Sequence, residues 1–358
     1  MNLGAELHDI RVVDASRLGP GPYATSLLVQ LGAEVVKIEE PGRGDYLRAE
    51  PPLVDGVGHF FTVLNRGKRS VVADLKTSEG RRAVLELAAQ SQVMVESFRP
   101  GVADRLGIGY EDVLAVNSTI VYCSVNGWGE PGEPAGHDLS YLAETGYLAS
   151  NARATGSAPG PQATLLADFA AGQAAALRIT AALVAGGPRR LSVPIAQAAL
   201  ALDPIGVAEH LSDLPSGRTM TGGRSRYAVY RCRDEAYLAV AALEDKFWAR
   251  FLEVAGVDSE GSEDDFGTRI AEAIEQRTGE EWRAALANAD ACAAVVDDLA
   301  TAVPRLLDRF PHWWIRDRSG TPVGVALPGS PGATLDPPPR LGDFDLGAST
   351  LVTARGQE

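Results

Sequence analysis

The amino-acid sequence predicts an α/β protein with a Rossmann-like parallel sheet in a large domain and a smaller α+β domain. Short β-rich runs alternate with helical stretches over the first 125 residues, a pattern typical of a parallel, doubly wound sheet. A hairpin pattern followed by several helices begins near residue 225. The chain has 358 residues, and because single cores stop growing near 250–300 residues, two or more domains are expected.

Five apolar, β-branched runs predict the strands of the parallel sheet. They cover residues 10–15, 34–40, 69–75, 93–97 and 119–125. Between them, "YATSLLVQLG" and "SEGRRAVLELAAQ" carry apolar residues at helical spacing. Pro22 suits a first helical turn and Gly32 suits a helix end. Residues 163–185 then predict a long Ala-rich helix that can pack closely against other backbone.

The second half of the chain predicts a connection and the smaller domain. Residues 188–224 end in "DLPSGRTMTGGRS", which indicates a crossover. "RYAVYRC" and "EAYLAVAAL" flank a four-residue turn and predict a hairpin. Helices follow, one of them with a capping box of Thr278 and Glu281. We predict a large domain over 1–190 completed by 325–358, a linker over 191–224 and a small domain over 225–324, with the Pro-rich tail extended on the large domain.

Composition argues against several functional classes. The net charge of −14 argues against general nucleic-acid binding. No run approaches the ~18 apolar residues of a membrane helix, and the first residues lack the basic flank and apolar core of a signal peptide. Cys123, Cys232 and Cys292 lie far apart and form no metal pattern. We therefore expect a cytoplasmic protein with reduced thiols, no bound metal and no membrane or nucleic-acid partner.

Basic side chains gather locally despite the acidic balance. They are Arg66, Lys68 and Arg69 in "NRGKRS", Lys76, and Arg99 and Arg105 in "SFRPGVADRLG". A solvated surface would explain any one of them. However, these stretches adjoin predicted strands of one parallel sheet, at whose edge crevice ligands bind. A phosphorylated nucleotide would suit this local charge.

The turn "GPGPYA" offers a competing interpretation. It fits the G-x-G-x-x-A pattern of dinucleotide-binding turns, and the next strand ends in acids. Pro20 and Pro22, however, remove amide donors that would bind a pyrophosphate. The residues "SRLG" also separate the strand from the turn. A nicotinamide site is therefore the less favoured interpretation.

Three polar residues lie just beyond apolar elements, where side chains project into a cleft. His137 follows the loop "GWGEPGEP", Asp168 begins the Ala-rich helix, and Glu244 ends a predicted strand. Each has an ordinary structural explanation as well. The residue after His137, Asp138, would cap a helix, Asp168 would be favoured by the helix dipole, and Glu244 could be a cap. None of the three indicates a reaction alone.

The chain resembles family III CoA-transferases nearly from end to end. The resemblance is carried by "GPGPYATSLLVQLGAEVVKIEEPGRGD", "NRGKRSVVADLKTSEGR", "VMVESFRPGVADRLGIGYEDV", "VYCSVNGWGEPG", "LLADFAAG", "GGRSRYAVYRCRDEAYLAVAALEDKFW" and "PPPRLG". It implies a Rossmann-like large domain completed by the C-terminus, and two chains interlocked as rings in a homodimer with active sites at domain interfaces. It also implies an acyl-CoA substrate and no cofactor beyond coenzyme A itself.

His137, Asp168 and Glu244 match the racemase branch of this family position by position. The resemblance implies that all three are catalytic, with His137 as a base, in interconverting (R)- and (S)-2-methylacyl-CoA. Moving the α-proton between two faces needs two groups of matched proton affinity near neutral pH. We expect apolar surroundings, or a proton shared with Glu244, to raise the pKa of Asp168. Backbone amides around Asp168 would bind the enolate oxygen.

The resemblance also assigns the CoA site and leaves two alternatives. Residues expected to bind CoA are Ala73, Lys76, Ser97, Phe98, Arg99 and Arg105. Many members carry Arg where this chain has Glu40, so we expect Arg99 and Arg105 to hold more of the CoA charge. One alternative is CoA transfer between carboxylic acids, with Asp168 as nucleophile. The other is a non-enzymatic subunit that has lost CoA binding, which Glu40 suggests.

Overall fold

The chain folds into two compact units, which are described separately. The computed structural model describes residues 6–214, 220, 223–258 and 263–344. Unit 1 comprises Met1–Tyr147, Pro161–Asp203 and Phe310–Glu358, and unit 2 comprises Leu148–Gly160 and Pro204–Arg309. The first unit therefore continues to Asp203, whereas the sequence analysis ended it at 190. Parts of the predicted linker 191–224 and of the tail 325–358 lie outside the described residues.

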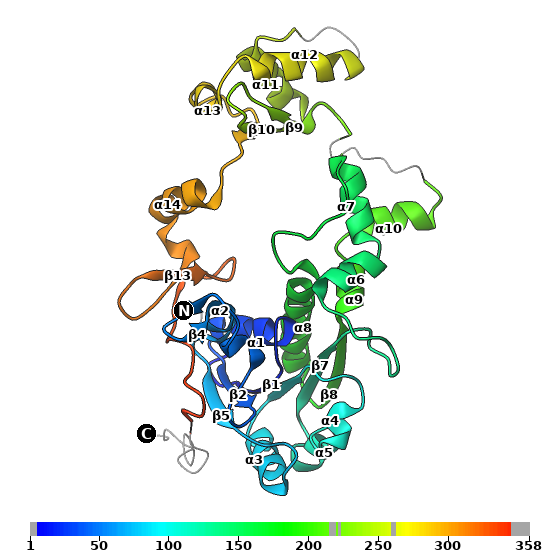
Figure 1. Cartoon of the computed structure of the whole chain (residues 1–358), viewed down its shortest axis with the longest axis vertical. Coiled ribbons are helices and arrows are strands. Elements are labelled where there is room, and N and C mark those ends of the chain that lie inside the picture. The colour runs from blue at the N-terminus through cyan, green and yellow to red at the C-terminus, as the bar shows by residue number, and fades with distance from the viewer. Residues whose placement is uncertain (1–5, 215–219, 221–222, 259–262, 345–358) are drawn as a thin grey trace. The chain divides into compact units, whose positions relative to one another are not determined.

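Unit 1 is built on a six-stranded parallel sheet (Figure 1). Its strands are β1 Arg11–Ala15, β2 Glu34–Glu39, β5 Arg69–Val72, β6 Val93–Glu96, β7 Val121–Asn126 and β8 Arg189–Pro194. Their order is β5-β2-β1-β6-β7-β8. The five predicted strands are confirmed, and β8 lies where a crossover was expected. Because the strand order reverses between β1 and β6, a crevice at their carboxyl ends is the place where such sheets bind ligands.

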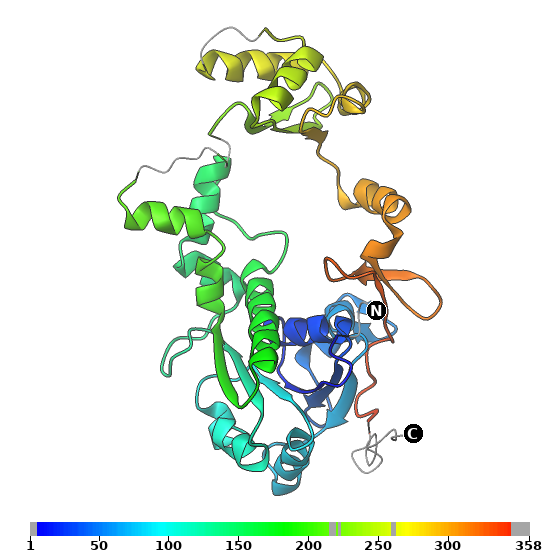
Figure 2. The same cartoon turned by 180° about the vertical axis from the view of Figure 1, so that it is seen from behind.

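Helices cover both faces of this sheet (Figures 1 and 2). They are α1 Pro20–Gln30, α2 His59–Asn65, α3 Ser78–Ala88, α4 Val102–Arg105, α5 Tyr110–Val116, α6 Asp138–Glu144, α8 Leu166–Ala185 and α9 Ile195–Leu200. Val84 of α3 and Val113 of α5 share a core with Val13 of β1. The neighbouring Val12 points to the opposite face, since strand side chains alternate. On that face α1 and α8 pack against each other.

The contact between α1 and α8 depends on a glycine. A Cβ at Gly172 of α8 would lie 2.7 Å from the carbonyl oxygen of Pro20 and 2.8 Å from Cδ1 of Tyr23. Nearby, the rings of Tyr23 and Phe169 are 4.6 Å apart. The Ala-rich helix therefore packs closely, as predicted, and its first turn lies beside the beginning of α1.

The remaining elements of unit 1 include the returning C-terminal segment. They are η1 Tyr46–Arg48, β3 Leu53–Val54, β4 Val57–Gly58, η2 Pro311–Trp313, β12 Trp314–Arg316, β13 Pro322–Val325 and β14 Ala333–Thr334. The described part of the Pro-rich tail lies along the edge strand β5. Ser70 N donates to Asp343 Oδ1 at 2.9 Å, and Phe344 N donates to Ser70 O at 3.0 Å. Arg48 Nη2 also donates to Pro339 O at 3.0 Å.

Unit 2 is a small α+β fold. Its elements are β9 Tyr227–Arg231, β10 Tyr237–Ala241, β11 Ala293–Val295, α7 Tyr147–Thr155 (whose first residue belongs to unit 1), α10 Pro204–Leu211, α11 Asp245–Ala255, α12 Glu263–Glu275, α13 Gly279–Leu286 and α14 Leu299–Arg309. β9 and β10 form the predicted antiparallel hairpin. Trp248, Phe251 and Trp282 are buried in its core. The capping box is confirmed, because Glu281 N donates to Thr278 Oγ1 at 3.2 Å and the Glu281 carboxylate accepts from Thr278 N at 2.7 Å.

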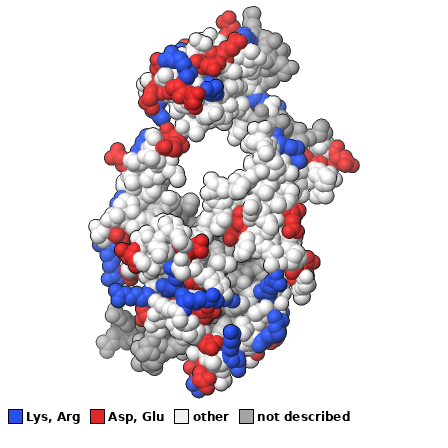
Figure 3. Space-filling view, in the orientation of Figure 1, with Lys and Arg blue, Asp and Glu red and all other residues white. Residues whose placement is uncertain are grey.

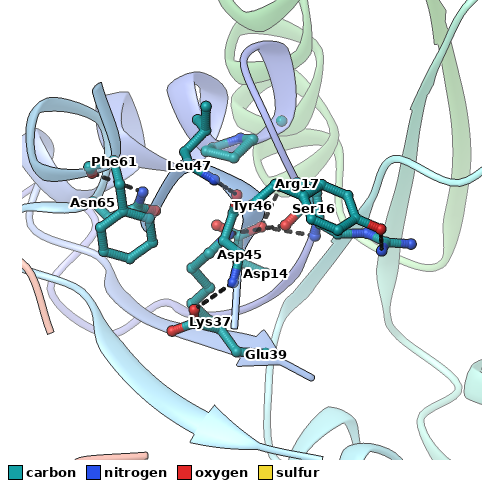
Figure 4. Close-up of polar contacts among 12 residues, drawn as sticks. Asp14, Ser16, Arg17, Lys37, Glu39, Asp45, Tyr46, Leu47, Phe61 and Asn65 are labelled. Carbon is teal, nitrogen blue, oxygen red and sulfur yellow. Dashed lines mark hydrogen bonds and ion pairs between the residues drawn. The ribbon is translucent and has the colours of Figure 1, made fainter. Parts of the chain in front are cut away.

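Four buried charged side chains form two ion pairs around β1 and β2. Lys68 Nζ lies 3.0 Å from Asp14 Oδ2, and Lys37 Nζ lies 3.0 Å from Asp45 Oδ2. All four side chains have 0% exposure. Figure 4 shows Lys37 reaching Asp45, and its amine also donates to Ser16 O at 2.9 Å. Such charges remain buried only when they are paired and hydrogen-bonded.

Lys68 joins three elements of unit 1 through its ammonium group. It donates to Pro22 O and Thr25 Oγ1 of α1 at 2.9 and 2.8 Å, and to Asn65 Oδ1 of α2 at 2.8 Å. Burial, together with the nearby Lys37, lowers the pKa of Lys68 to about 8. Burial alone would raise the pKa of Asp14, but the two ammonium groups hold it well below its usual range.

We predict that Lys68→Met lowers the free energy of unfolding by about 3–5 kcal/mol, because it leaves the Asp14 carboxylate buried without its partner. Urea denaturation followed by circular dichroism at neutral pH measures this loss. Arg82→Met is the control: Arg82 is 73% exposed and lies 3.7 Å from Glu86, so its loss is expected to stay within about 0.5 kcal/mol. Equal effects of the two substitutions would contradict the role given to Lys68.

Candidate active site

A cleft of about 600 Å³ opens at the carboxyl ends of β1 and β6, where the strand order reverses. Arg17 after β1 and Ser97, Phe98 and Arg99 after β6 line it. The loop after β7 and the beginning of α8 complete its wall. Every lining residue belongs to unit 1. The cleft therefore lies where the topology of a doubly wound sheet places a ligand.

His137 and Asp168 both line this cleft. His137 is exposed and is the N-cap residue of α6. Its backbone is fixed, because its N–H donates to Ser140 Oγ at 3.0 Å and its carbonyl accepts from Ser140 N at 2.9 Å. The backbone is thus anchored while the imidazole remains accessible in the cleft.

Asp138 caps α8, whereas the sequence analysis expected it to cap its own helix. Its Oδ1 accepts hydrogen bonds from Ala167 N at 2.7 Å and from Asp168 N at 3.1 Å. The buried carboxylate therefore ties the beginning of α6, next to His137, to the beginning of α8. It also takes the amides that were expected to bind an enolate oxygen, so that expectation is wrong.

Asp168 occupies the first turn of α8, as predicted, and has an altered proton affinity. Burial, and then the negative charge of Asp138, raises its pKa to about 7. A Cβ at Gly19 would lie 2.4 Å from Asp168 Oδ2, so a side chain there would displace the carboxyl group. The carboxyl group is therefore enclosed on one side and titrates near neutral pH.

Glu244 belongs to unit 2, whereas His137 and Asp168 belong to unit 1. It precedes α11 as the N-cap residue, but its side chain makes no capping hydrogen bond. Its ordinary structural explanation as a cap is therefore not supported. A catalytic role for Glu244 stays a prediction.

A second cavity of about 310 Å³ shares Arg17, Tyr46 and Phe98 with the cleft. It is also lined by Glu40 and Arg43, which follow β2. The residues predicted to bind CoA divide between the two spaces: Ala73, Lys76 and Phe98 line the second cavity, and Ser97, Phe98, Arg99 and Arg105 line the cleft. The two spaces together could bind a long ligand with one end near His137 and Asp168 and the other near Lys76 and Arg43.

Arg17 stands at the junction of the two spaces and was missed by the sequence analysis. Its Nη1 donates to Tyr46 Oη at 2.9 Å (Figure 4), and its guanidinium lies 5.1 Å from the centre of the Phe98 ring. Ser97 Oγ accepts from Arg17 N at 2.8 Å, so Ser97 links the two loops. The sequence could have indicated Arg17 by its position just after the first strand. It lies in the stretch "SRLG", which the sequence analysis treated only as a spacer.

The cations of "NRGKRS" line neither space. Lys68 is buried against Asp14, so it is not available to a ligand, contrary to expectation. Arg69 lies 3.4 Å from Glu34, and its guanidinium lies 4.9 Å from the centre of the Phe344 ring. Figure 3 shows Lys and Arg side chains exposed over unit 1, in the lower part of the view.

The described residues contain no group of three His, Cys, Asp or Glu side chains that could hold a metal ion. Within the same ranges, no helix is both long and apolar enough to cross a bilayer. Cys123, Cys232 and Cys292 are free thiols, as expected, and only Cys292 is exposed.

Comparisons with known proteins identify relatives over nearly the whole chain. The model of CoA-transferase family III matches residues 7–343. The alpha-methylacyl-CoA racemase of Mus musculus is 30% identical over 92% of this chain and 90% of its own length. The succinyl-CoA:glutarate CoA-transferase of Mus musculus is 39% identical over 43% of this chain and 35% of its own length. A crystal structure of a CAIB/BAIF family protein from Brucella suis shares the fold, with a TM-score of 0.78 and 24% identity over 93% of this chain and 95% of that chain.

We predict that Asp168→Asn stabilises the protein increasingly as the pH rises. The pKa of Asp168 is raised from 3.8 to about 7 in the folded chain, so the wild type loses stability as the pH rises through this window. The advantage of Asn over Asp should grow by roughly 2–3 kcal/mol between about pH 5 and pH 8. Urea denaturation at both pH values measures it, with the exposed Asp308→Asn as control. An advantage that does not change with pH would contradict the raised pKa.

Proposed function

The chain belongs to CoA-transferase family III, and from that premise we propose that it is an acyl-CoA racemase. It would interconvert (R)- and (S)-2-methylacyl-CoA thioesters by removing the α-proton and returning it. The supporting observation is that His137 and Asp168 line one cleft, with a pKa of about 7 for Asp168. The relative of 30% identity over most of the chain is a racemase of this class.

The proposed reaction needs one group to accept a proton and another to donate one. One of His137 and Asp168 takes the α-proton, and the electron pair of the broken C–H bond passes into the thioester enolate. The other group, already protonated, returns a proton to the opposite face. A carboxyl group with a pKa of about 7 is present in both forms at neutral pH, which suits a reversible exchange. Histidine also exchanges protons in this range.

The enolate oxygen requires donors other than the amides that Asp138 occupies. We assign this role to the backbone N–H groups of Asp138 and Leu139 at the beginning of α6, because that of Ser140 already donates to His137 O. The first amides of a helix lack intrahelical partners and carry partial positive charge. The base and the oxyanion donors would then come from one short segment.

The CoA moiety would extend from the cleft into the second cavity. Lys76 in the second cavity, Arg17 at the junction and Arg99 and Arg105 in the cleft supply cations for its phosphate groups. The thioester end would reach His137 and Asp168. No cofactor beyond the CoA of the substrate is needed for this reaction.

The second candidate function is CoA transfer between carboxylic acids through an acyl–Asp168 intermediate. The CoA-transferase of 39% identity over part of the chain favours it. The racemase of 30% identity matches 92% of this chain, whereas the transferase matches 43%, and this makes racemisation the better supported of the two.

We predict that the enzyme exchanges the α-hydrogen of (R)-2-methylacyl-CoA with deuterium in D₂O and forms both epimers. Mass spectrometry and chiral analysis measure exchange and epimerisation. His137→Ala and Asp168→Asn should each lower the rate by about 10²–10⁴-fold, because each removes a proton-transfer group. Activity that needs Asp168 as a carboxylate base should increase as the pH rises through about 7.

Hydroxylamine separates this function from its alternatives. A hydroxamate at Asp168 in the presence of acyl-CoA, with activity that survives His137→Ala, would indicate CoA transfer instead. Titration calorimetry that detects no CoA binding would favour a subunit without catalytic activity.

We also propose that two chains form an interlocked homodimer. On α8, Leu177 is 70% exposed and Val184 is 86% exposed. In unit 2, α10 and α14 have no buried residue, and Leu211 and Leu299 are 79% and 80% exposed. Apolar faces of this kind mark interaction surfaces. A second copy of the chain would cover them.

Light scattering over a wide dilution series tests this assembly. We expect a dimer at every concentration, because interlocked subunits must partly unfold before they separate. A monomer that appears reversibly on dilution, and that remains folded by circular dichroism, would contradict interlocking.

A further inference from the structure

We propose that Glu40 is an internal competitor for the phosphate groups of CoA and sets the affinity of the second cavity for them. Its carboxylate occupies a place between cations that a bound phosphate would otherwise take. This inference rests on the proposed acyl-CoA substrate. It assigns to Glu40 a role in specificity without any part in the proton transfer.

Glu40 forms an ion pair with Arg43 just after the carboxyl end of β2. Arg43 Nε donates to Glu40 Oε1, and both residues line the second cavity. The Arg43 side chain is 60% exposed and that of Glu40 is 39% exposed, so solvent or a ligand can reach the pair. The guanidinium of Arg43 lies 4.3 Å from the centre of the Tyr46 ring. Since Arg17 bonds to the hydroxyl of the same tyrosine at 2.9 Å, Tyr46 brings two cations together beside Glu40.

Three cations stabilise the charged form of Glu40. The hydrogen bond from Arg43 comes first among the causes that lower the pKa of Glu40, and the charges of Arg17 and Lys76 lower it further. One carboxylate therefore partly neutralises three cations that line the cavity. Those are the cations expected to meet a nucleotide.

The other acidic side chains of the cavity accept hydrogen bonds from donors other than Arg43. Glu39 accepts two hydrogen bonds from Arg48, each at 2.6 Å. Asp45 is paired with the buried Lys37 at 3.0 Å. Asp74 Oδ1 accepts from the backbone N–H of Lys76 at 2.9 Å. Glu40 is therefore the carboxylate in this lining whose displacement would release cations toward a ligand.

Phosphate and Glu40 would compete for the same donors. A phosphate group takes paired N–H donors of arginine more strongly than a single exposed carboxylate does. Binding would still require Arg43 to exchange its partner, and the displaced Glu40 would remain close to the phosphate as a like charge. Removing the charge of Glu40 should thus strengthen binding of the nucleotide part and leave the thioester part unchanged.

Titration calorimetry on the full chain tests the proposal with CoA, 3′-dephospho-CoA, pantetheine and inorganic pyrophosphate. We expect Glu40→Gln to bind CoA roughly three- to tenfold more tightly than the wild type, with unchanged affinity for pantetheine. The gain should shrink in high salt, because the repulsion is screened. The exposed Glu50→Gln, which lines neither space, is the matched control and should change nothing. In the exchange assay, Glu40→Gln should lower KM and leave kcat unchanged.

The ligand series identifies the phosphate that competes with Glu40. If Glu40→Gln also binds 3′-dephospho-CoA more tightly than the wild type does, the diphosphate is the group that competes with Glu40. If the gain in affinity disappears with this ligand, the 3′-phosphate is the competing group. Both results support the proposal. The proposal is overturned if Glu40→Gln binds CoA no more tightly than the wild type does. Glu40→Ala is the second variant and must give the same result. If no form binds CoA but Glu40→Gln gains affinity for pyrophosphate, the proposed function fails and the competition stands. If no form binds either ligand, both fail.

Discussion

The geometry of the site depends on two ion pairs that have no access to water. Lys37 holds the carbonyl of Ser16 and the carboxylate of Asp45, and these residues directly precede Arg17 and Tyr46, which meet where the cleft joins the second cavity. A buried pair of this kind adds little net stability compared with apolar packing. Its greater effect is to make other arrangements of these loops costly, because each would leave a charge buried alone. The buried Lys37–Asp45 pair thus fixes the loops that carry Arg17 and Tyr46, although Lys37 itself lines neither of the two spaces.

Asp138 has two effects on the cleft that come from one interaction. Its carboxylate joins the beginnings of α6 and α8, which keeps His137 and Asp168 on the walls of the same space. The same negative charge helps to raise the pKa of Asp168 to about 7. Positioning and proton affinity are therefore coupled, and a substitution at Asp138 would change both together. An uncharged capping side chain could join the two helices, but it would not raise the pKa of Asp168.

Local sequence patterns were sufficient for strands that are buried along nearly their whole length, such as β1, β2 and β6, and for helices with one apolar face. They failed for β8, where the exposed Arg189 and Arg190 interrupt the apolar pattern that marks a buried strand. They also failed for Lys68, because a buried lysine and a surface lysine look alike in sequence and differ only in their partners. His137 and Asp168 were identified through family resemblance, whereas the contact of Asp138 with α8 spans 29 residues and has no local signature.

The tail that returns to β5 has a consequence for how the protein is made. Ser70 on this edge strand is paired with Asp343, which lies 273 positions later in the chain. While a ribosome is still synthesising unit 2, β5 therefore exposes unpaired backbone groups, and an open edge of this kind invites pairing with other nascent chains. The contact that covers this part of the edge can therefore form only after residue 343 has been synthesised. Unit 1 can thus complete its sheet edge only after unit 2 has been made.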